Sequence, residues 1–262
     1  MSDAVLYEAH GPVGLITLNR PDNRNSMTPE ILDGFAIAAT RAATDETLRA
    51  LIVTGTGKCF SAGADFKSQI QREDAGSKLA PHEKSYAMYE PFLTLLDVKI
   101  PVIGALNGHA VGGGFGLSLV CDIRIAATEA KYGANFTKLG LAPGMAITYL
   151  LPRLVGVSRA AEMLFTGELF EGKDAVALGY ASRAVPGADV LAEALRLAER
   201  IAASAPLAVR YTKQVLYQGM EWDPRSHAKK EAVLQAKTVA SADAKEGIQA
   251  LLEKRVPRFT GE

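Results

Sequence analysis

The segment IGALNGHAVGGGFGLSLVCD, residues 103–122, decides the fold, because it is apolar, rich in glycine and changes its periodicity halfway. Residues 101–106 have the character of a buried strand, and residues 115–121 are apolar enough to begin a buried helix. Gly112, Gly113 and Gly114 stand at the junction, where the lack of a Cβ lets another group lie against bare main chain. We therefore expect a close approach between this junction and another part of the molecule.

A helix that begins at these glycines leaves its first N–H groups unpaired and presents the positive end of its dipole. Such a helix start favours an anion, or a carbonyl oxygen that acquires negative charge. A second segment, FSAGADFK at residues 60–67, also follows an apolar strand, residues 50–54, with small residues. Two strand ends that each offer a free N–H can bind one oxygen from two sides. The alternative is that the glycines only allow a helix to pack tightly on a sheet.

Length and composition limit the possible functions. A chain of 262 residues buries roughly three quarters of its unfolded surface, enough for one large domain or one domain with an appendage. Lys plus Arg and Asp plus Glu both number 29, so no overall charge attracts nucleic acid. Cys59 and Cys121 lack metal-ligand spacing and fit a reducing compartment, and neither a signal peptide nor a membrane-spanning run is apparent. We expect a cytoplasmic protein without a metal, a nucleic-acid partner or a membrane.

Strand and helix signals alternate along the first part of the chain. Two strands, residues 5–10 and 13–18, flank Gly11-Pro12 and precede a helix with Thr28 at its N-cap and Pro29 at its first position. Further strands at residues 50–54, 101–106 and 122–127, separated by helices, indicate βαβ units. The polar residues 69–84 predict a loop or lid.

After residue 154 the pattern becomes mainly helical. Ser158 is expected to cap a helix, and further helices are predicted at residues 190–203, 207–218, 227–239 and 242–254. We divide the chain at about residue 200 into an α/β core, residues 1–200, and a helical extension, residues 201–262.

The chain resembles the enoyl-CoA hydratase/isomerase family, also called the crotonase superfamily. The likeness is carried by LNRP at residues 18–21 with Asn25, FSAGAD at 60–65, NG at 107–108, GGG at 112–114, CD at 121–122, EGI at 246–248 and KRVPRFTG at 254–261. It extends from about the first strand to the last residue. It implies an α/β fold, the ClpP/crotonase-like spiral of ββα units, with a C-terminal helical region that forms homotrimers or hexamers and covers the active site.

The resemblance also implies an acyl-CoA thioester as substrate, with no separate cofactor. The backbone N–H groups of Ala64 and Gly113 match the pair that holds the thioester oxygen and stabilises an enolate or a tetrahedral oxyanion. One such donor is typically worth about 3 to 4 kcal/mol in the transition state. The resemblance and the expected pocket together place substrate contacts at Arg24, Ala62, Asp65, Phe66, Lys67, Tyr86, Gly116, Phe136, Gly144, Met145 and Lys254.

The sequence departs from the family in its acid and base groups. The two glutamates of the hydratases correspond to Gly116 and Phe136, and an acid common in isomerases, dehalogenases and hydrolases corresponds to Gly144. Water addition to an enoyl thioester needs a base and an acid, each worth about 10² to 10⁴ in rate, so plain hydration is expected to be weak. Isomerisation, decarboxylation or other thioester chemistry is more plausible. The residues weighed as substitutes are Asp65, His82, Lys84, Tyr86, Tyr89, Glu90, His109 and Asn135.

The acyl pocket is expected to be apolar because of Phe136, Gly116 and Met145, and wide because Gly116 and Gly144 lack side chains. Such a pocket suits a bulky acyl group. The alternative function is a non-catalytic acyl-CoA-binding or carrier protein that has kept the cradle without the acid and base. RNA binding, known for a few members of the family, is disfavoured by the zero net charge and the lack of a basic aromatic stripe.

Overall fold

The computed structural model describes residues 3–65 and 79–262. Its centre is a six-stranded sheet in the order β1-β2-β3-β5-β7-β10, in which β1 and β2 are antiparallel and the remaining neighbours are parallel. The strands are β1 (Val5–His10), β2 (Val13–Leu18), β3 (Ala50–Gly55), β5 (Val102–Leu106), β7 (Ile123–Ala127) and β10 (Arg183–Val185). The predicted strands and their parallel arrangement are confirmed, and β1 and β2 have the predicted bounds.

A second sheet of very short strands lies beside the first, in the order β4-β6-β8-β9. Its strands are β4 (Cys59–Ser61), β6 (His109–Val111), β8 (Lys131–Gly133) and β9 (Phe170–Glu171). Each of β3, β5 and β7 is followed by one of the short parallel strands β4, β6 and β8, so the chain repeats a two-strand unit. This repetition is the spiral of ββα units that the resemblance implies.

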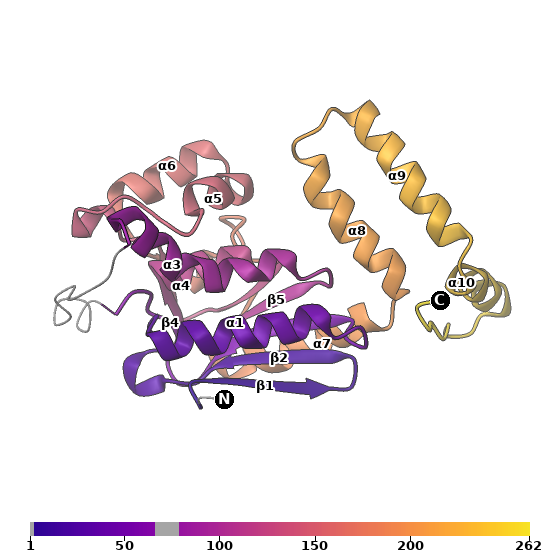
Figure 1. Cartoon of the computed structure of the whole chain (residues 1–262), viewed down its shortest axis with the longest axis horizontal. Helices are drawn as coiled ribbons and strands as arrows, with labels where there is room; N and C mark the ends of the chain where they lie inside the picture. The colour runs from indigo at the N-terminus through magenta and orange to yellow at the C-terminus, as the bar shows by residue number, and fades with distance from the viewer. Residues whose placement is uncertain (1–2, 66–78) are drawn as a thin grey trace.

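Helices cover the large sheet and the spiral (Figure 1). The helix α1 packs on β1 and β2, and α7 packs on β3, β5 and β7. The bounds are α1 (Pro29–Thr44), α3 (Pro81–Leu93), α4 (Gly113–Val120), α5 (Ile147–Val155), α6 (Val157–Thr166) and α7 (Val190–Ala202). Short 3-10 turns occur at Pro21–Asn23, Thr94–Asp97, Thr137–Leu139, Gly172–Asp174 and Gly187–Asp189.

Two expected helix caps have different outcomes. The Thr28 side chain accepts the N–H of Ile31, so the cap of α1 is confirmed. The expected cap at Ser158 is wrong, because α6 begins at Val157 with Gly156 as its N-cap. Gly156 has a φ of 80°, a left-handed conformation that lets α5 end and α6 begin around one residue. The expected lid, residues 69–84, lies mostly outside the described residues, and α3 begins within its last part.

The last helices form a C-terminal arm, residues 206–262, which extends away from the sheets (Figure 1). It contains α8 (Pro206–Gly219), α9 (Pro224–Val239) and α10 (Ala242–Glu253), and α9 packs against both α8 and α10. The arm is attached to the core by polar contacts: Arg49 donates to the carbonyl oxygen of Phe259, and Arg210 donates to that of Glu46. The proposed boundary near residue 200 stays a prediction. None of the described helices is long and apolar enough to cross a membrane.

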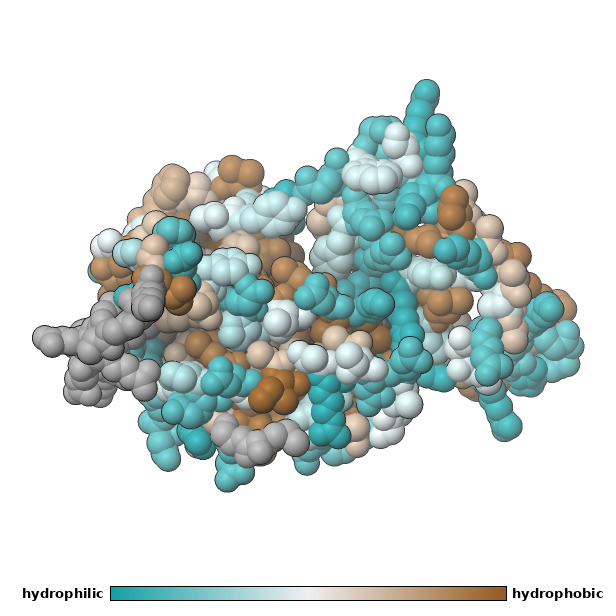
Figure 2. Space-filling view, viewed as in Figure 1, coloured by the Kyte–Doolittle hydropathy of each residue, from teal (hydrophilic) through white to brown (hydrophobic). Residues whose placement is uncertain are grey.

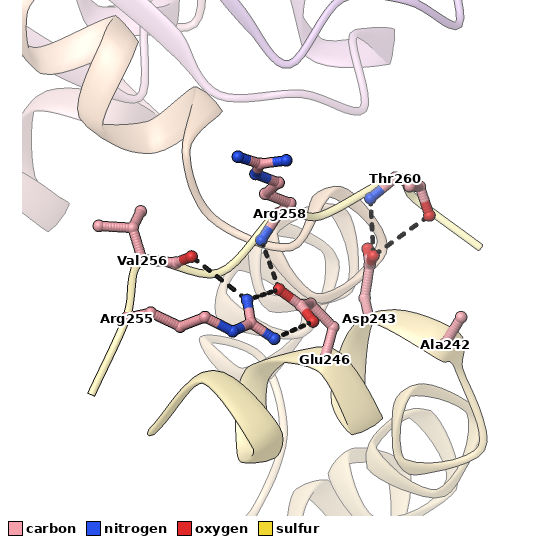
Figure 3. A pocket seen from close by; sticks show the side chains of 7 residues that line it. All are labelled: Ala242, Asp243, Glu246, Arg255, Val256, Arg258 and Thr260. Atoms are coloured by element: carbon pink, nitrogen blue, oxygen red, sulfur yellow. Dashed lines mark hydrogen bonds and ion pairs between the residues drawn. The ribbon is translucent and has the colours of Figure 1, made fainter. Parts of the chain in front are cut away.

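A hollow of about 670 Å³ in the arm is lined by carboxylates that already have partners within the chain (Figure 3). The Glu246 carboxylate accepts two hydrogen bonds from the Arg255 guanidinium, at 2.6 and 2.8 Å, and one from the Arg258 N–H. Asp243 accepts the N–H groups of Thr260 and Gly261. These carboxylates therefore fold the last residues back onto α10 rather than offering free groups to a ligand.

The tail should detach from α10 at acid pH. The Arg255 hydrogen bonds lower the pKa of Glu246 from 4.5 to about 2. Because this pKa is lower in the folded than in the unfolded chain, the stabilisation is present above about pH 4.5 and is lost as the pH falls towards 2. Hydrogen-exchange protection of the Arg258 amide should fall across this range. The Glu246→Gln variant should show low protection throughout, and equal protection of both proteins at pH 6 would contradict the assignment.

Candidate functional site

A cavity of about 570 Å³ opens at the N-terminal end of α4, beside the ends of the short strands. Several residues expected to contact the substrate line it together although they are far apart in the sequence: Arg24, Ala62, Ala64, Asp65, Gly113 and Phe136. The strand ends at residues 60–65 and 112–114, singled out in the sequence, therefore meet at one cavity.

The contact between these segments is made by bare backbone. A Cβ added to Gly63, whose φ is 79°, would lie 2.6 Å from the Val111 oxygen and 2.7 Å from the Gly113 nitrogen. Ala64 follows directly, so the N–H groups of Ala64 and Gly113 belong to adjoining stretches of main chain. In the part of the chain that the structure describes, neither N–H donates to a protein acceptor. Both residues line the cavity, where two unpaired donors suit an oxygen that gains negative charge.

The segment that carries Ala64 is fixed by the loop around Asn25. This residue is fully buried and has a φ of 52°, a left-handed conformation that asparagine tolerates better than most residues. Its side chain accepts the Arg20 N–H at 2.8 Å and donates to the Cys59 oxygen at 2.8 Å. The Ser61 hydroxyl donates to the Asn25 carbonyl at 2.8 Å. The motif residue Asn25 therefore joins the loop to β4, the strand that leads to Ala64.

The start of α4 depends on glycine for two reasons. Gly112 has φ 58° and ψ −120°, a combination that a side chain strongly disfavours. A Cβ on Gly114 would lie 2.1 Å from the Ser61 carbonyl oxygen, so α4 packs directly on β4. The interpretation that the glycines permit close packing is therefore correct, and it coexists with the two free N–H groups.

The expectation of a wide acyl pocket at Gly116 and Gly144 is wrong. A Cβ on Gly116 would lie 2.6 Å from the Cβ of Met145, and a Cβ on Gly144 would lie 2.4 Å from the Tyr89 hydroxyl. Two larger side chains thus fill the space that these glycines leave. Met145 is buried with a φ of 59°, so the chain holds it there at the expense of backbone strain.

The other expected contacts lie away from the cavity or outside the described residues. Tyr86 lies on α3, is 55% exposed, and lines a shallow groove with Glu90. A hydrogen bond from Tyr86 to Glu90 raises the pKa of the tyrosine. Lys254 follows α10 in the exposed arm. Phe66 and Lys67 are not among the described residues.

The cavity also has lining residues that the sequence interpretation missed: Asp22, Asn23, Cys59, Lys131, Leu139 and Leu169. Lys131 and Leu169 reach the cavity through the pairing of β8 with β9, two strands too short to leave a periodic signal. Asn23 donates to the Asp65 carboxylate at 3.4 Å, which explains why residues 22–24 and 65 share the site. Asn135, considered earlier as a substitute residue, lines it too.

Few proton-transfer groups lie at the cavity. Among its described lining residues, the carboxylates belong to Asp22 and Asp65. The His109 Nδ1 accepts the Lys131 N–H at 2.9 Å, so a neutral imidazole carries its proton on Nε2. Burial raises the pKa of the Cys59 thiol, opposed by the charge of Arg24, so this thiol is neutral near pH 7. Within the described residues, no group of three or more His, Cys, Asp or Glu is placed to hold a metal ion.

Comparisons with known proteins show which family this chain resembles. The model of the enoyl-CoA hydratase/isomerase family matches residues 8–262. A probable enoyl-CoA hydratase of Mycobacterium bovis is 34% identical over 98% of both chains. The (E)-benzylidenesuccinyl-CoA hydratase of Thauera aromatica is also 34% identical, over 98% of this chain and 99% of its own.

A solved structure extends the likeness to three dimensions. The enoyl-CoA hydratase of Bacillus anthracis superposes with a TM-score of 0.91 at 34% identity, over 99% of this chain and 100% of that one. The crotonase fold implied by the motifs is thereby confirmed. With a family match across nearly the whole chain and relatives above 30% identity, the protein belongs to the enoyl-CoA hydratase/isomerase family.

Proposed function

We propose that this family member is an acyl-CoA enzyme that binds a thioester oxygen between the N–H groups of Ala64 and Gly113. The observation that carries the proposal is that both donors lack a described protein acceptor and lie at one cavity. Two preorganised donors stabilise an enolate or a tetrahedral oxyanion more than they stabilise the neutral carbonyl, and this difference lowers the barrier. The thioester supplies its own activation, so the proposal includes no cofactor.

The charges and apolar groups of the cavity divide the proposed ligand into two parts. Arg24 and Lys131 bring positive charge for the phosphates of CoA, and Ala62 and Asp65 border the same space. Phe136, Leu139 and Leu169 supply an apolar wall for the acyl group. Gly116, Gly144 and Met145 are not among the described lining residues of this cavity, and Met145 and Tyr89 fill the space beside the two glycines. Phe66, Lys67, Tyr86 and Lys254 stay predicted contacts.

We propose an apolar acyl group and a reaction other than plain hydration. The relative from Thauera aromatica is named for an aromatic acyl thioester, which supports the apolar character of the group. The names of the relatives favour hydration, but glycine and phenylalanine stand where hydratases carry glutamate, at Gly116 and Phe136. Isomerisation, decarboxylation or another reaction of the enolate fits this set of residues better.

A panel of thioesters in D₂O tests the proposal. Saturated, 2-enoyl, 3-enoyl and malonyl-type CoA thioesters are incubated with the protein, and product masses and binding are followed together. Deuteration at the α-carbon, a shifted double bond, decarboxylation or release of CoA is the expected result. Prompt hydration of crotonyl-CoA would contradict the argument from the missing glutamates.

The alternative is an acyl-CoA carrier without catalysis. The contact of Gly116 with Met145 favours it, because this contact leaves no room for a carboxylate on that turn of α4. Tight binding of thioesters with every product mass unchanged would support the carrier and exclude the enzyme.

We also propose that the protein is a homotrimer or a hexamer in the cytoplasm. Large apolar side chains are exposed on the C-terminal arm, among them Leu251 (78% exposed), Leu252 (73%) and Val256 (81%). Figure 2 shows apolar patches between the polar residues of this arm. A contiguous exposed apolar patch marks a contact surface, and another copy of this chain is the partner in this proposal. Light scattering at several concentrations measures the mass, and a monomer at micromolar concentration would oppose the proposal.

A further inference from the structure

Met27 contacts both halves of the proposed oxyanion site without offering a donor to it. Its N–H donates to the Gly63 oxygen at 2.8 Å, and it forms a parallel β-bridge with Ala64. Its side chain lies against the start of α4, because a Cβ on Gly113 would be 2.3 Å from the Met27 sulfur. One residue therefore joins the backbone that carries the first N–H to the backbone that carries the second.

The surroundings of Met27 make it a fixed support. It is 5% exposed and belongs to the main hydrophobic core. The loop before it is held by Asn25, and the helix after it begins at Pro29 with Thr28 as its cap. The chain is therefore anchored on both sides of Met27, and these two anchors hold its thioether against Gly113.

We propose that Met27 is a positioning residue that sets the separation of the Ala64 and Gly113 N–H groups. Its backbone fixes the strand end at Gly63 and Ala64, and its thioether limits how far Gly113 can move towards it. An unbranched, polarisable side chain fits closely against a bare glycine backbone, which suits methionine to this place. The residue acts through the two donors and does not touch the reacting atoms.

This inference rests on the proposed function. It predicts an effect on binding of the enolate oxygen and none on binding of the CoA part of the ligand. Acetoacetyl-CoA is a suitable probe, because its enolate absorbs in the near ultraviolet. The enolate also carries the negative oxygen that two N–H groups would bind. When the keto form becomes the enolate, the α-proton is lost to solvent and the oxygen gains negative charge. The measured quantity is the equilibrium ratio of the two forms, which does not depend on a catalytic acid or base. CoA alone lacks the carbonyl and reports on the remaining contacts.

The experiment compares Met27→Ala, Met27→Leu and the wild type. Met27→Ala should lower the ratio of bound enolate to bound keto form by at least about tenfold, because one misplaced donor commonly costs 10² to 10³ in oxyanion stabilisation. Its affinity for CoA should stay within about twofold of the wild type. Met27→Leu, which conserves the volume, should recover most of the ratio. Met163→Ala, at a partly buried methionine on α6, is the matched control and should leave the ratio unchanged.

A second pair of variants keeps the test independent of folding defects. Gly113→Ala retains the N–H but directs a methyl group at the Met27 sulfur, and it should lower the ratio as well. The double variant Met27→Ala/Gly113→Ala frees this space, so the two effects should be less than additive. Strict additivity, or a Met27→Ala ratio equal to that of the wild type, would overturn the inference. Absence of any enolate on the wild type would instead refute the proposed function.

Discussion

Gly114→Ala is expected to lower thioester turnover by at least about 10² and the free energy of unfolding by about 2 to 4 kcal/mol. The new Cβ would lie 2.1 Å from the Ser61 carbonyl oxygen and 2.6 Å from its carbon. Both are backbone atoms of β4 and cannot rotate aside, so α4 must move away from the strand. That movement separates Gly113 from Ala64. Turnover of the thioester selected by the panel and urea denaturation measure the two effects.

The matched control for this variant is Gly247→Ala on α10. A Cβ there would meet only the Phe259 ring, at an ordinary distance of 3.4 Å. Since alanine favours a helix over glycine, this change should leave turnover intact and add about 0.5 to 1 kcal/mol of stability. Wild-type turnover in Gly114→Ala would show that the packing of α4 on β4 does not govern the site.

The second large effect is expected at Asp122, which connects the core to the C-terminal arm. Its carboxylate accepts hydrogen bonds from the Lys213 ammonium at 2.7 Å, the Tyr217 hydroxyl at 2.6 Å and the Val102 N–H at 2.7 Å. The side chains of Asp122 and Lys213 are each 14% exposed. Asp122→Asn leaves the ammonium without its counter-ion, and the loss should be about 2 to 4 kcal/mol. Urea denaturation and the protease sensitivity of α8 measure it.

A surface pair of the same chemistry provides the control for Asp122→Asn. Arg153 and Glu221 form an ion pair at 2.9 Å with side chains that are 35% and 54% exposed. Because water and salt screen such a pair, Glu221→Gln should cost much less stability than Asp122→Asn. If both variants lose the same stability, Asp122 is not the anchor of the arm. Burial, together with the neighbouring Asp122 carboxylate, raises the pKa of Tyr217. The Tyr217 hydroxyl therefore keeps its proton at neutral pH and can donate it to Asp122.

The sequence predicted what depends on neighbours in the chain. The cap at Thr28, the strand at residues 50–54 and the glycines at 112–114 each have a local signal, and each has the expected structure. The meeting of Ala64 with Gly113 was also predictable, because the resemblance pairs these two positions. Six of the thirteen residues named for the site line the cavity, among them Ala64 and Gly113, and their roles stay predictions.

The remaining features depend on residues that are distant in the sequence. Nothing near Gly116 shows that Met145 fills its space, or near Gly144 that Tyr89 does, so the pocket was predicted too wide. The strand β9 has two residues, too few to show an alternation of apolar and polar side chains. The lining residues Leu169 and Lys131, which reach the cavity through the pairing of β8 with β9, were therefore not predicted. Ser158 has the composition of a cap, but Gly156 takes that place because only a left-handed residue joins α5 to α6.

The two donors proposed for the oxyanion are main-chain atoms, and this has an evolutionary consequence. Apart from proline, no substitution at Ala64 or Gly113 deletes an N–H, so a substitution can displace these donors but does not remove them as it removes a catalytic side chain. Residues around it, such as Phe136 and the Gly116–Met145 pair, can therefore diverge separately. A lineage built on this scaffold can exchange one thioester reaction for another while its capacity to hold a negative oxygen is inherited intact.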